Sequence, residues 1–199
     1  MSMLVWGLCC AVSLADCPTN HVSTRAYQAG QPAASGEHLR SSQVTDVFVT
    51  FLEKELVEAA DAMPANKYSF VPTTGEFTAV RSFGAQVKHL SATNYILAAA
   101  ALGQPPPKDA GDETGPDSIR TKADILDYLR GSFRELHKAA QAIDEGNAIV
   151  RDVPISPLIG KATRLGYVEE ALLHTYDHYG QMVIYLRMNG VVPPASRQR

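Results

Sequence analysis

The chain contains little cysteine, and none of it lies beyond residue 17. Its 199 residues include three cysteines, Cys9, Cys10 and Cys17. A disulfide framework, a thiolate zinc site and a cysteine nucleophile are therefore excluded from the rest of the chain. Chemistry in that part must use nitrogen ligands, hydroxyl groups or carboxylates.

A surplus of charge of one sign is also missing. The chain has 18 Lys and Arg against 21 Asp and Glu, a formal net charge of −3. Proteins that bind nucleic acid by neutralising phosphates usually carry a basic surplus or a basic stripe. We therefore expect no nucleic-acid partner. The 45% of hydrophobic and 20% of charged residues are typical of a globular domain.

Hydrophobic runs long enough to cross a membrane are absent, because a spanning helix needs about 20 apolar residues. An uncharged apolar run at residues 3–14 has the length of the apolar part of a signal peptide, with Ser13 and Ala15 before a cleavage point. We predict a signal peptide at 1–15, export to the periplasm, a disordered leader at 16–40 and no stable membrane insertion. A cytoplasmic protein with an unstructured start is the alternative.

From residue 41 onward, apolar residues recur at helical spacing. The pattern predicts helices at about 41–63, 83–102, 121–145 and 164–188. Ser82 is the expected N-cap of the second helix; an earlier start at Thr73 is the alternative. The expected buried stripe of the first helix comprises Val44, Val47, Phe48, Phe51, Leu52 and Leu56.

Four amphipathic helices without an alternating strand pattern predict an all-α four-helix bundle over residues 41–199. The connections after the first three helices are moderately long. A simple up-down topology is therefore not required by the sequence, and the order of neighbours in the bundle stays open.

Three of the six histidines can form a metal site. His174 and His178 lie four residues apart on the predicted fourth helix, so both side chains share one face. His89 lies on the second helix and could complete the set if these two helices are adjacent; a packed core histidine is the alternative. Three protein ligands leave a coordination position open, as a catalytic metal requires.

Polar residues on the same helix are candidates for roles beside the metal. Gln181 shares the face of the two histidines, and it could orient a ligand, a water molecule or a substrate. Glu170 and Asp177 lie four before and three after His174. Either carboxylate could accept the second imidazole N–H, and both are candidates for the catalytic acid or base; a solvated charge is the alternative for each.

Two segments resemble the DinB (DinB/YfiT-like) family. Residues 81–89, Arg-Ser-Phe-Gly-Ala-Gln-Val-Lys-His, are similar to the start of its second helix. Residues 174–181 with Tyr-Leu-Arg at 185–187 and the proline pair at 193–194 are similar to its fourth helix. The resemblance implies a bundle, often dimeric, that holds a divalent metal through His89, His174 and His178. Many relatives have Trp before the serine that starts this helix, whereas Val80 and Arg81 precede Ser82 here.

The family includes metal-dependent thiol S-transferases, a maleylpyruvate isomerase and suspected hydrolases. We therefore predict an enzyme of hydrolase or thiol S-transferase type that acts on a small molecule through a His₃ centre between the second and fourth helices. The expected metal is Zn or Ni, and the expected assembly is a homodimer. An exported, non-catalytic bundle that binds a metal or a ligand is the alternative.

Overall fold

The computed structural model describes residues 36, 39–107, 110, 112–150 and 162–197. These residues form helices α1 (Ser41–Ala62), α2 (Phe83–Leu102), α3 (Lys122–Gln141) and α4 (Arg164–Met188), with short 3₁₀ helices at Ala65–Lys67 and Pro194–Ser196 and no strand. The predicted all-α class is confirmed. The predicted signal peptide lies outside the described residues, as does most of the leader. None of the described helices is both long and apolar enough to cross a membrane.

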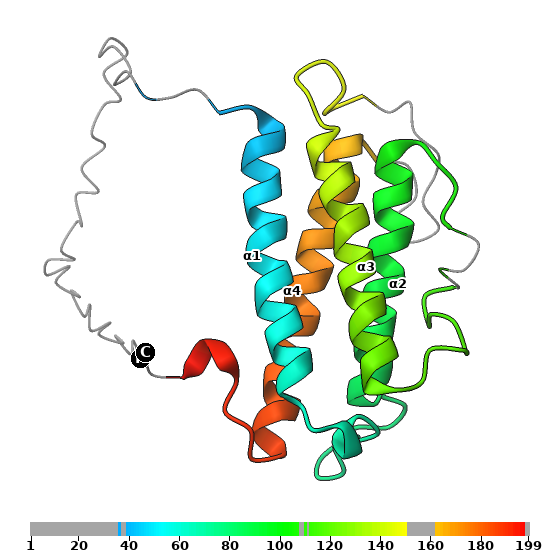
Figure 1. Cartoon of the computed structure of the whole chain (residues 1–199), viewed down its shortest axis with the longest axis vertical. Coiled ribbons are helices and arrows are strands. Elements are labelled where there is room, and N and C mark those ends of the chain that lie inside the picture. Colours follow the sequence, from blue (N-terminus) through cyan, green and yellow to red (C-terminus); the bar gives the residue numbers. More distant parts are fainter. Residues whose placement is uncertain (1–35, 37–38, 108–109, 111, 151–161, 198–199) are drawn as a thin grey trace, which may run out of the picture. The chain divides into compact units, whose positions relative to one another are not determined.

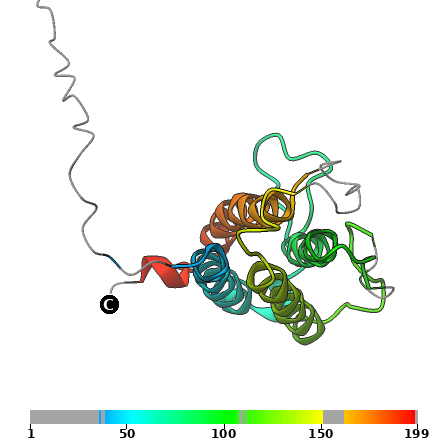
Figure 2. The ribbon, with the colours of Figure 1, turned by 90° about the horizontal axis from the view of Figure 1, so that it is seen from above.

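The four helices form a bundle in which α2 and α1 each pack against both α3 and α4 (Figure 2). Helices α2 and α3 run in one direction and α1 and α4 in the other (Figure 1). At one end, Arg164 of α4 donates a hydrogen bond to the Ala101 carbonyl of α2, 2.9 Å away. Because α2 and α3 run in the same direction, the connection at 103–121 returns along the bundle between them. This crossover settles the topology that the sequence left open.

The helix ends follow the predicted signals closely. The Ser82 side chain accepts a hydrogen bond from the Ala85 N–H at 3.3 Å, which confirms Ser82 rather than Thr73 as the start of α2. Gly103 ends this helix with a φ of 70°, a left-handed conformation that glycine adopts without steric cost. Helix α4 has the predicted bounds, and Gly190 follows its C-cap, also with positive φ.

Helix α3 ends four residues before its predicted end at residue 145. The Asp144 carboxylate accepts hydrogen bonds from the N–H groups of Gly146 and Asn147, at 2.8 and 2.9 Å. The Asn147 side chain in turn donates to the Ala142 carbonyl at 2.9 Å. These local bonds give the backbone a turn in place of another helical turn.

The prediction for the buried face of α1 was wrong in part. Leu52 and Leu56 are buried, but four members of the expected stripe are exposed. The buried face uses small and polar residues that the apolar pattern did not single out, so it lies beside the predicted one. The buried residues of α1 are Thr45, Val49, Leu52, Leu56, Ala59 and Ala60. The exposed members are Val44, Val47, Phe48 and Phe51.

An ionic cluster joins α1 to α3. His137 lies between two carboxylates, with Nδ1 2.6 Å from Asp46 Oδ1 and Nε2 3.1 Å from Glu53 Oε2. Burial favours the neutral ring, but the hydrogen bonds and negative charges of both carboxylates outweigh it, so the pKa of His137 is raised. Protonated His137 therefore stabilises the contact between the two helices.

We expect the stabilisation by His137 to depend on pH. A pKa raised in the folded state adds stability below the unfolded pKa of about 6.5, and this stability is lost as the pH rises through the folded value. The free energy of unfolding should differ between wild type and His137→Gln by up to about 1 kcal/mol near pH 6. The difference should shrink near pH 9. Urea unfolding with a metal chelator present measures it, and an equal difference at both pH values would contradict the assignment.

Candidate metal centre

The antiparallel contact between α2 and α4 brings the three predicted histidines together. His174 Nε2 lies 3.1 Å from His89 Nε2 and 3.0 Å from His178 Nε2. His89 and His178 are buried, and His174 is half-buried. Among the described residues, they form the one group of three potential ligands whose atoms all lie within 4.8 Å of one another.

These distances fit a shared metal ion. Two nitrogens bound to one ion at about 2.0–2.1 Å, with bond angles of roughly 90–110°, are about 2.8–3.4 Å apart. Hydrogen bonding satisfies the cluster less well, because a proton on His174 Nε2 can point directly at only one of its two neighbours. A cation would instead satisfy all three lone pairs together.

The connection at 103–121 fixes the ring of His89. Its Nδ1 lies 2.6 Å from the Glu113 carbonyl oxygen. A carbonyl oxygen can only accept, so Nδ1 donates and carries the proton of the neutral ring. Nε2 is therefore left with its lone pair, directed at the other two histidines. Such an outer partner orients a metal-binding imidazole.

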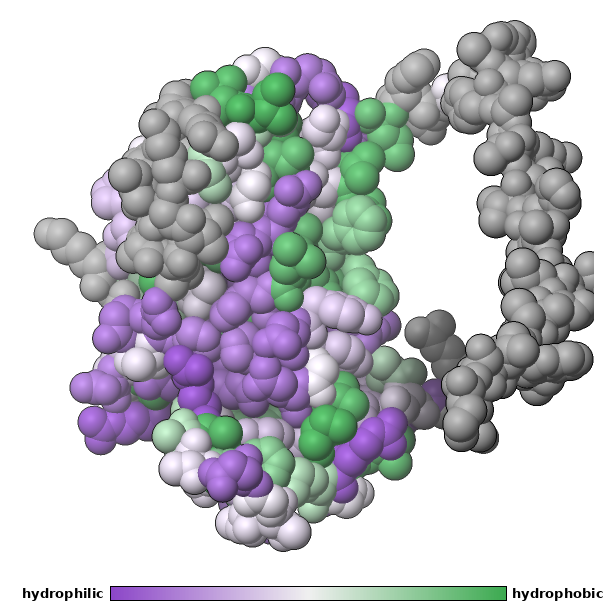
Figure 3. Space-filling model, turned by 180° about the vertical axis from the view of Figure 1, so that it is seen from behind, coloured by the Kyte–Doolittle hydropathy of each residue, from purple (hydrophilic) through white to green (hydrophobic). Residues whose placement is uncertain are grey.

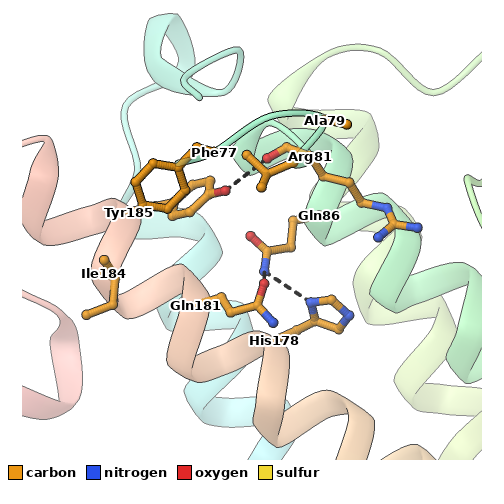
Figure 4. A pocket seen from close by; sticks show the side chains of 9 residues that line it. Phe77, Ala79, Arg81, Gln86, His178, Gln181, Ile184 and Tyr185 are labelled. Atoms are coloured by element: carbon orange, nitrogen blue, oxygen red, sulfur yellow. Dashed lines mark hydrogen bonds between the residues drawn. The ribbon is translucent and has the colours of Figure 1, made fainter. Parts of the chain in front are cut away.

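A chain of side chains reaches His178 from the surface (Figure 4). Asp177 Oδ2 accepts from Gln181 Nε2 at 2.7 Å, and Gln181 Oε1 accepts from Gln86 Nε2 at 2.8 Å. Gln86 Nε2 also lies 3.0 Å from His178 Nδ1, whereas its buried Oε1 has no partner among the described residues. Rotating the Gln86 and Gln181 amides together would place Gln86 Oε1 against Nδ1–H and turn Gln181 Nε2 from Asp177 to Gln86. The lone pair of His178 Nε2 would then be left for a metal.

The electrostatics keep the three rings neutral. Burial lowers the pKa of His174 to about 3, and the nearby charges of His178 and His89 add to the effect. Burial and then the charge of His89 lower the pKa of His178 to about 4. The pKa of His89 is also lowered, chiefly by burial. Neutral imidazoles are the form that binds a metal ion.

The predicted carboxylates lie on α4, but among the described residues neither forms a direct hydrogen bond with the three rings. Asp177 is exposed and reaches the cluster only through Gln181 and Gln86. Glu170 is half-buried, and no hydrogen bond among the described residues joins it to a histidine. Gln181, which the sequence predicted on the face of the two α4 histidines, is part of the hydrogen-bonded chain to His178.

Two partners of the histidines were missed from the sequence. Gln86 lies three residues before His89 and therefore on the same helical face, so its polarity within an apolar helix was an available signal. Glu113 offers only its backbone carbonyl, for which the residue type carries no signal.

A pocket of about 460 Å³ opens beside His178. Its walls come from the connector before α2, from the first turns of α2 and from the second half of α4 (Figure 4). Both Gln86 and Gln181 line it, so the hydrogen-bonded chain borders the space in which a small molecule would bind. The lining residues are Phe77, Ala79, Val80, Arg81, Gln86, His178, Gln181, Ile184 and Tyr185.

Fold and site together define a four-helix bundle with a three-histidine candidate metal centre. A model of the DinB superfamily matches residues 50–182, more than half of the chain. The chain therefore belongs to the DinB superfamily, as the resemblance of its two helical segments predicted. A comparison with curated proteins found no match.

We expect Gln86 to control metal affinity through His178. Gln86→Leu removes the acceptor for Nδ1–H and should weaken zinc binding about 10- to 100-fold. Gln86→Glu keeps an acceptor and should retain the affinity. Competition with a chromogenic zinc chelator measures both.

The control is Gln141→Leu, the same substitution at an exposed position of α3. It should leave zinc affinity unchanged. If Gln86→Leu bound zinc as tightly as the wild type, the amide would have no role in orienting His178.

Proposed function

We propose that the protein is a divalent-metal-dependent enzyme that acts on a small molecule in the pocket beside His178. The observation that carries this proposal is the convergence of three neutral imidazoles, one of which, His178, lines an open pocket. A structural metal site is usually closed by four protein ligands, whereas a catalytic one keeps a position for water or substrate. The described residues offer three such ligands.

His89, His174 and His178 would hold the ion, and Zn or Ni suits an all-imidazole set. When bound, such an ion polarises a substrate group and lowers the pKa of a coordinated water or thiol. Neighbouring residues of the chain orient the imidazole rings. Glu113 orients His89, and Gln86 orients His178.

The two carboxylates of α4, Asp177 and Glu170, have different proposed roles. Asp177 is the proposed positioning residue, because it accepts a hydrogen bond from Gln181, the amide that neighbours Gln86. Glu170 lies one turn before His174 on the same face of α4, and it is the proposed acid or base. The proposed reaction is hydrolysis or thiol transfer on a small molecule. Export, inferred from the N-terminal run, belongs to the same proposal.

The first test is the metal content of the purified protein. We expect about one divalent metal per chain in the wild type and strong loss in His89→Ala and His174→Ala. His137→Ala removes a histidine outside the cluster and should keep the metal, which makes it the matched control. Elemental analysis after dialysis measures all four proteins.

Wild-type protein that takes up neither Zn nor Ni would contradict the metal-dependent function. Where metal is present, a panel of esters and of thiol-transfer substrates tests catalysis with loaded and stripped protein. Tight ligand binding without turnover would contradict an enzyme and favour the ligand-binding bundle.

We also propose that the chain forms a homodimer through an apolar face on α1 and α4. Five side chains of this face are between 54% and 69% exposed. Figure 3 shows apolar side chains gathered along the border of these helices. A groove between them has only apolar and aromatic residues in its lining, so two copies related by a two-fold axis could bury it without desolvating charge. The five residues are Val47, Phe48, Phe51, Leu173 and Tyr176.

We expect Phe51→Glu combined with Leu173→Glu to convert the dimer into a monomer, because burying two unpaired carboxylates per subunit is costly. Light scattering coupled to gel filtration measures the molar mass. Ile149→Glu, which places the same charge at an exposed apolar residue outside this face, should remain dimeric. A wild type that is monomeric at all concentrations would contradict the dimer.

A further inference from the structure

Arg81 places a positive charge at the pocket, and the proposed metal centre does not require this charge. It directly precedes Ser82, the N-cap of α2, and its side chain is exposed at the pocket wall. Figure 4 shows the side chain extending from the connector on the side where the His178 ring lies. None of the ion pairs among the described residues involves Arg81.

The backbone of Arg81 is held firmly despite lying in a connector. Its carbonyl accepts a hydrogen bond from the Tyr185 hydroxyl at 3.1 Å. The Tyr185 ring packs edge-on against Phe70 at 5.9 Å between ring centroids. Two residues before Arg81, Ala79 has a φ of 62°, an unfavourable left-handed conformation for a residue with a Cβ atom. Such a conformation persists only where its surroundings impose it.

The pocket has one polar and one apolar wall. Arg81, Gln86 and Gln181 lie on the polar side with His178. Phe77, Ile184 and the ring of Tyr185 form the apolar side. A ligand that fits both walls has an apolar body and a polar group, and the volume of about 460 Å³ is in the range of small-molecule sites.

The polar wall favours an anion of single charge. Arg81 is the one charged side chain among the described residues that line the pocket, and the Asp177 carboxylate is hydrogen-bonded to Gln181. A guanidinium pairs with carboxylate or phosphate through two parallel hydrogen bonds. A phosphate dianion would normally receive further donors.

Those further donors are not offered by the start of α2. The Phe83 N–H donates to the Phe70 carbonyl at 3.0 Å, and the Gly84 N–H donates to the Tyr68 carbonyl at 2.8 Å. The close approach of Tyr68 needs a glycine, because a Cβ atom on residue 84 would lie 3.1 Å from that carbonyl oxygen. The helix terminus is thus closed by the connector, and Arg81 is the cation of this wall.

We propose that Arg81 binds the carboxylate of the substrate, and that the substrate class is therefore a small carboxylic acid with an apolar body. The inference rests on the proposed function, since the bound acid places its remaining groups beside the three histidines. Arg81 is a specificity-determining residue in this proposal. It holds the anion while His178 and Gln86 face the rest of the molecule.

The test compares phenylacetate with its uncharged analogue phenylacetamide by isothermal titration of zinc-loaded, full-length protein. We expect the wild type to bind the acid about tenfold or more tightly than the amide. Arg81→Gln should abolish the preference, and Arg81→Lys should keep part of it. Arg134→Gln, the same change at an exposed arginine of α3, should behave as the wild type.

Several outcomes would overturn the inference. An equal affinity of the wild type for acid and amide would show that the pocket does not select a carboxylate. A preference that survives in Arg81→Gln would show that another group, such as the metal, holds the anion. Tighter binding of phenyl phosphate than of phenylacetate would assign Arg81 to a phosphate instead.

The same titration with His174→Ala separates this inference from the proposed function. If the wild type contains no metal, the proposed function fails. A preference for the acid that depends on Arg81, in the wild-type or the His174→Ala background, would still support carboxylate recognition. If Arg81→Gln loses the preference for the acid and keeps its metal, the result supports both the proposed function and the carboxylate recognition by Arg81.

Discussion

The site depends on one packing interaction, the antiparallel contact of α2 with α4. This contact brings His89 Nε2 to 3.1 Å from His174 Nε2, which the spacing along α4 already places 3.0 Å from His178 Nε2. Five residues after His89 on α2, Asn94 accepts a hydrogen bond from Thr175 at 3.2 Å, so the two helices are also joined by a buried polar pair. Buried polar groups must find partners, and this requirement fixes the register of the helices. A shift by one turn would separate the imidazoles as well as this pair.

The sequence predicted those parts of the fold that depend on local chemistry. The bounds of α4, the Ser82 cap of α2 and the glycine at the end of α2 follow from the preferences of single residues at helix ends. The histidine cluster followed from helical spacing on α4 and from the resemblance of two segments to the DinB family. Neither argument gave the relative directions of the helices, because these depend on how the long connection at 103–121 returns along the bundle.

What the sequence could not predict depends on contacts between distant segments. Phe48 and Phe51 have the spacing of a buried stripe, yet the bundle covers the neighbouring face of α1. The pattern cannot distinguish a face that packs within one chain from a face that stays exposed on it. Gln86 was missed because its partner His178 lies on another helix. Arg81 was noticed only as a departure from the relatives; its place in the pocket became visible once α4 was positioned opposite it.

The hydrogen bond from His89 to the Glu113 carbonyl has a consequence for how this protein can change. The connection orients a ligand through its main chain, so the side chains along it are under little constraint from the metal centre. Its length and path are constrained instead, because adding or removing a residue would move the carbonyl away from the ring. Most surface loops tolerate insertions; this one should accept a new side chain at Glu113 readily, because only its carbonyl meets the ring, and new residues poorly.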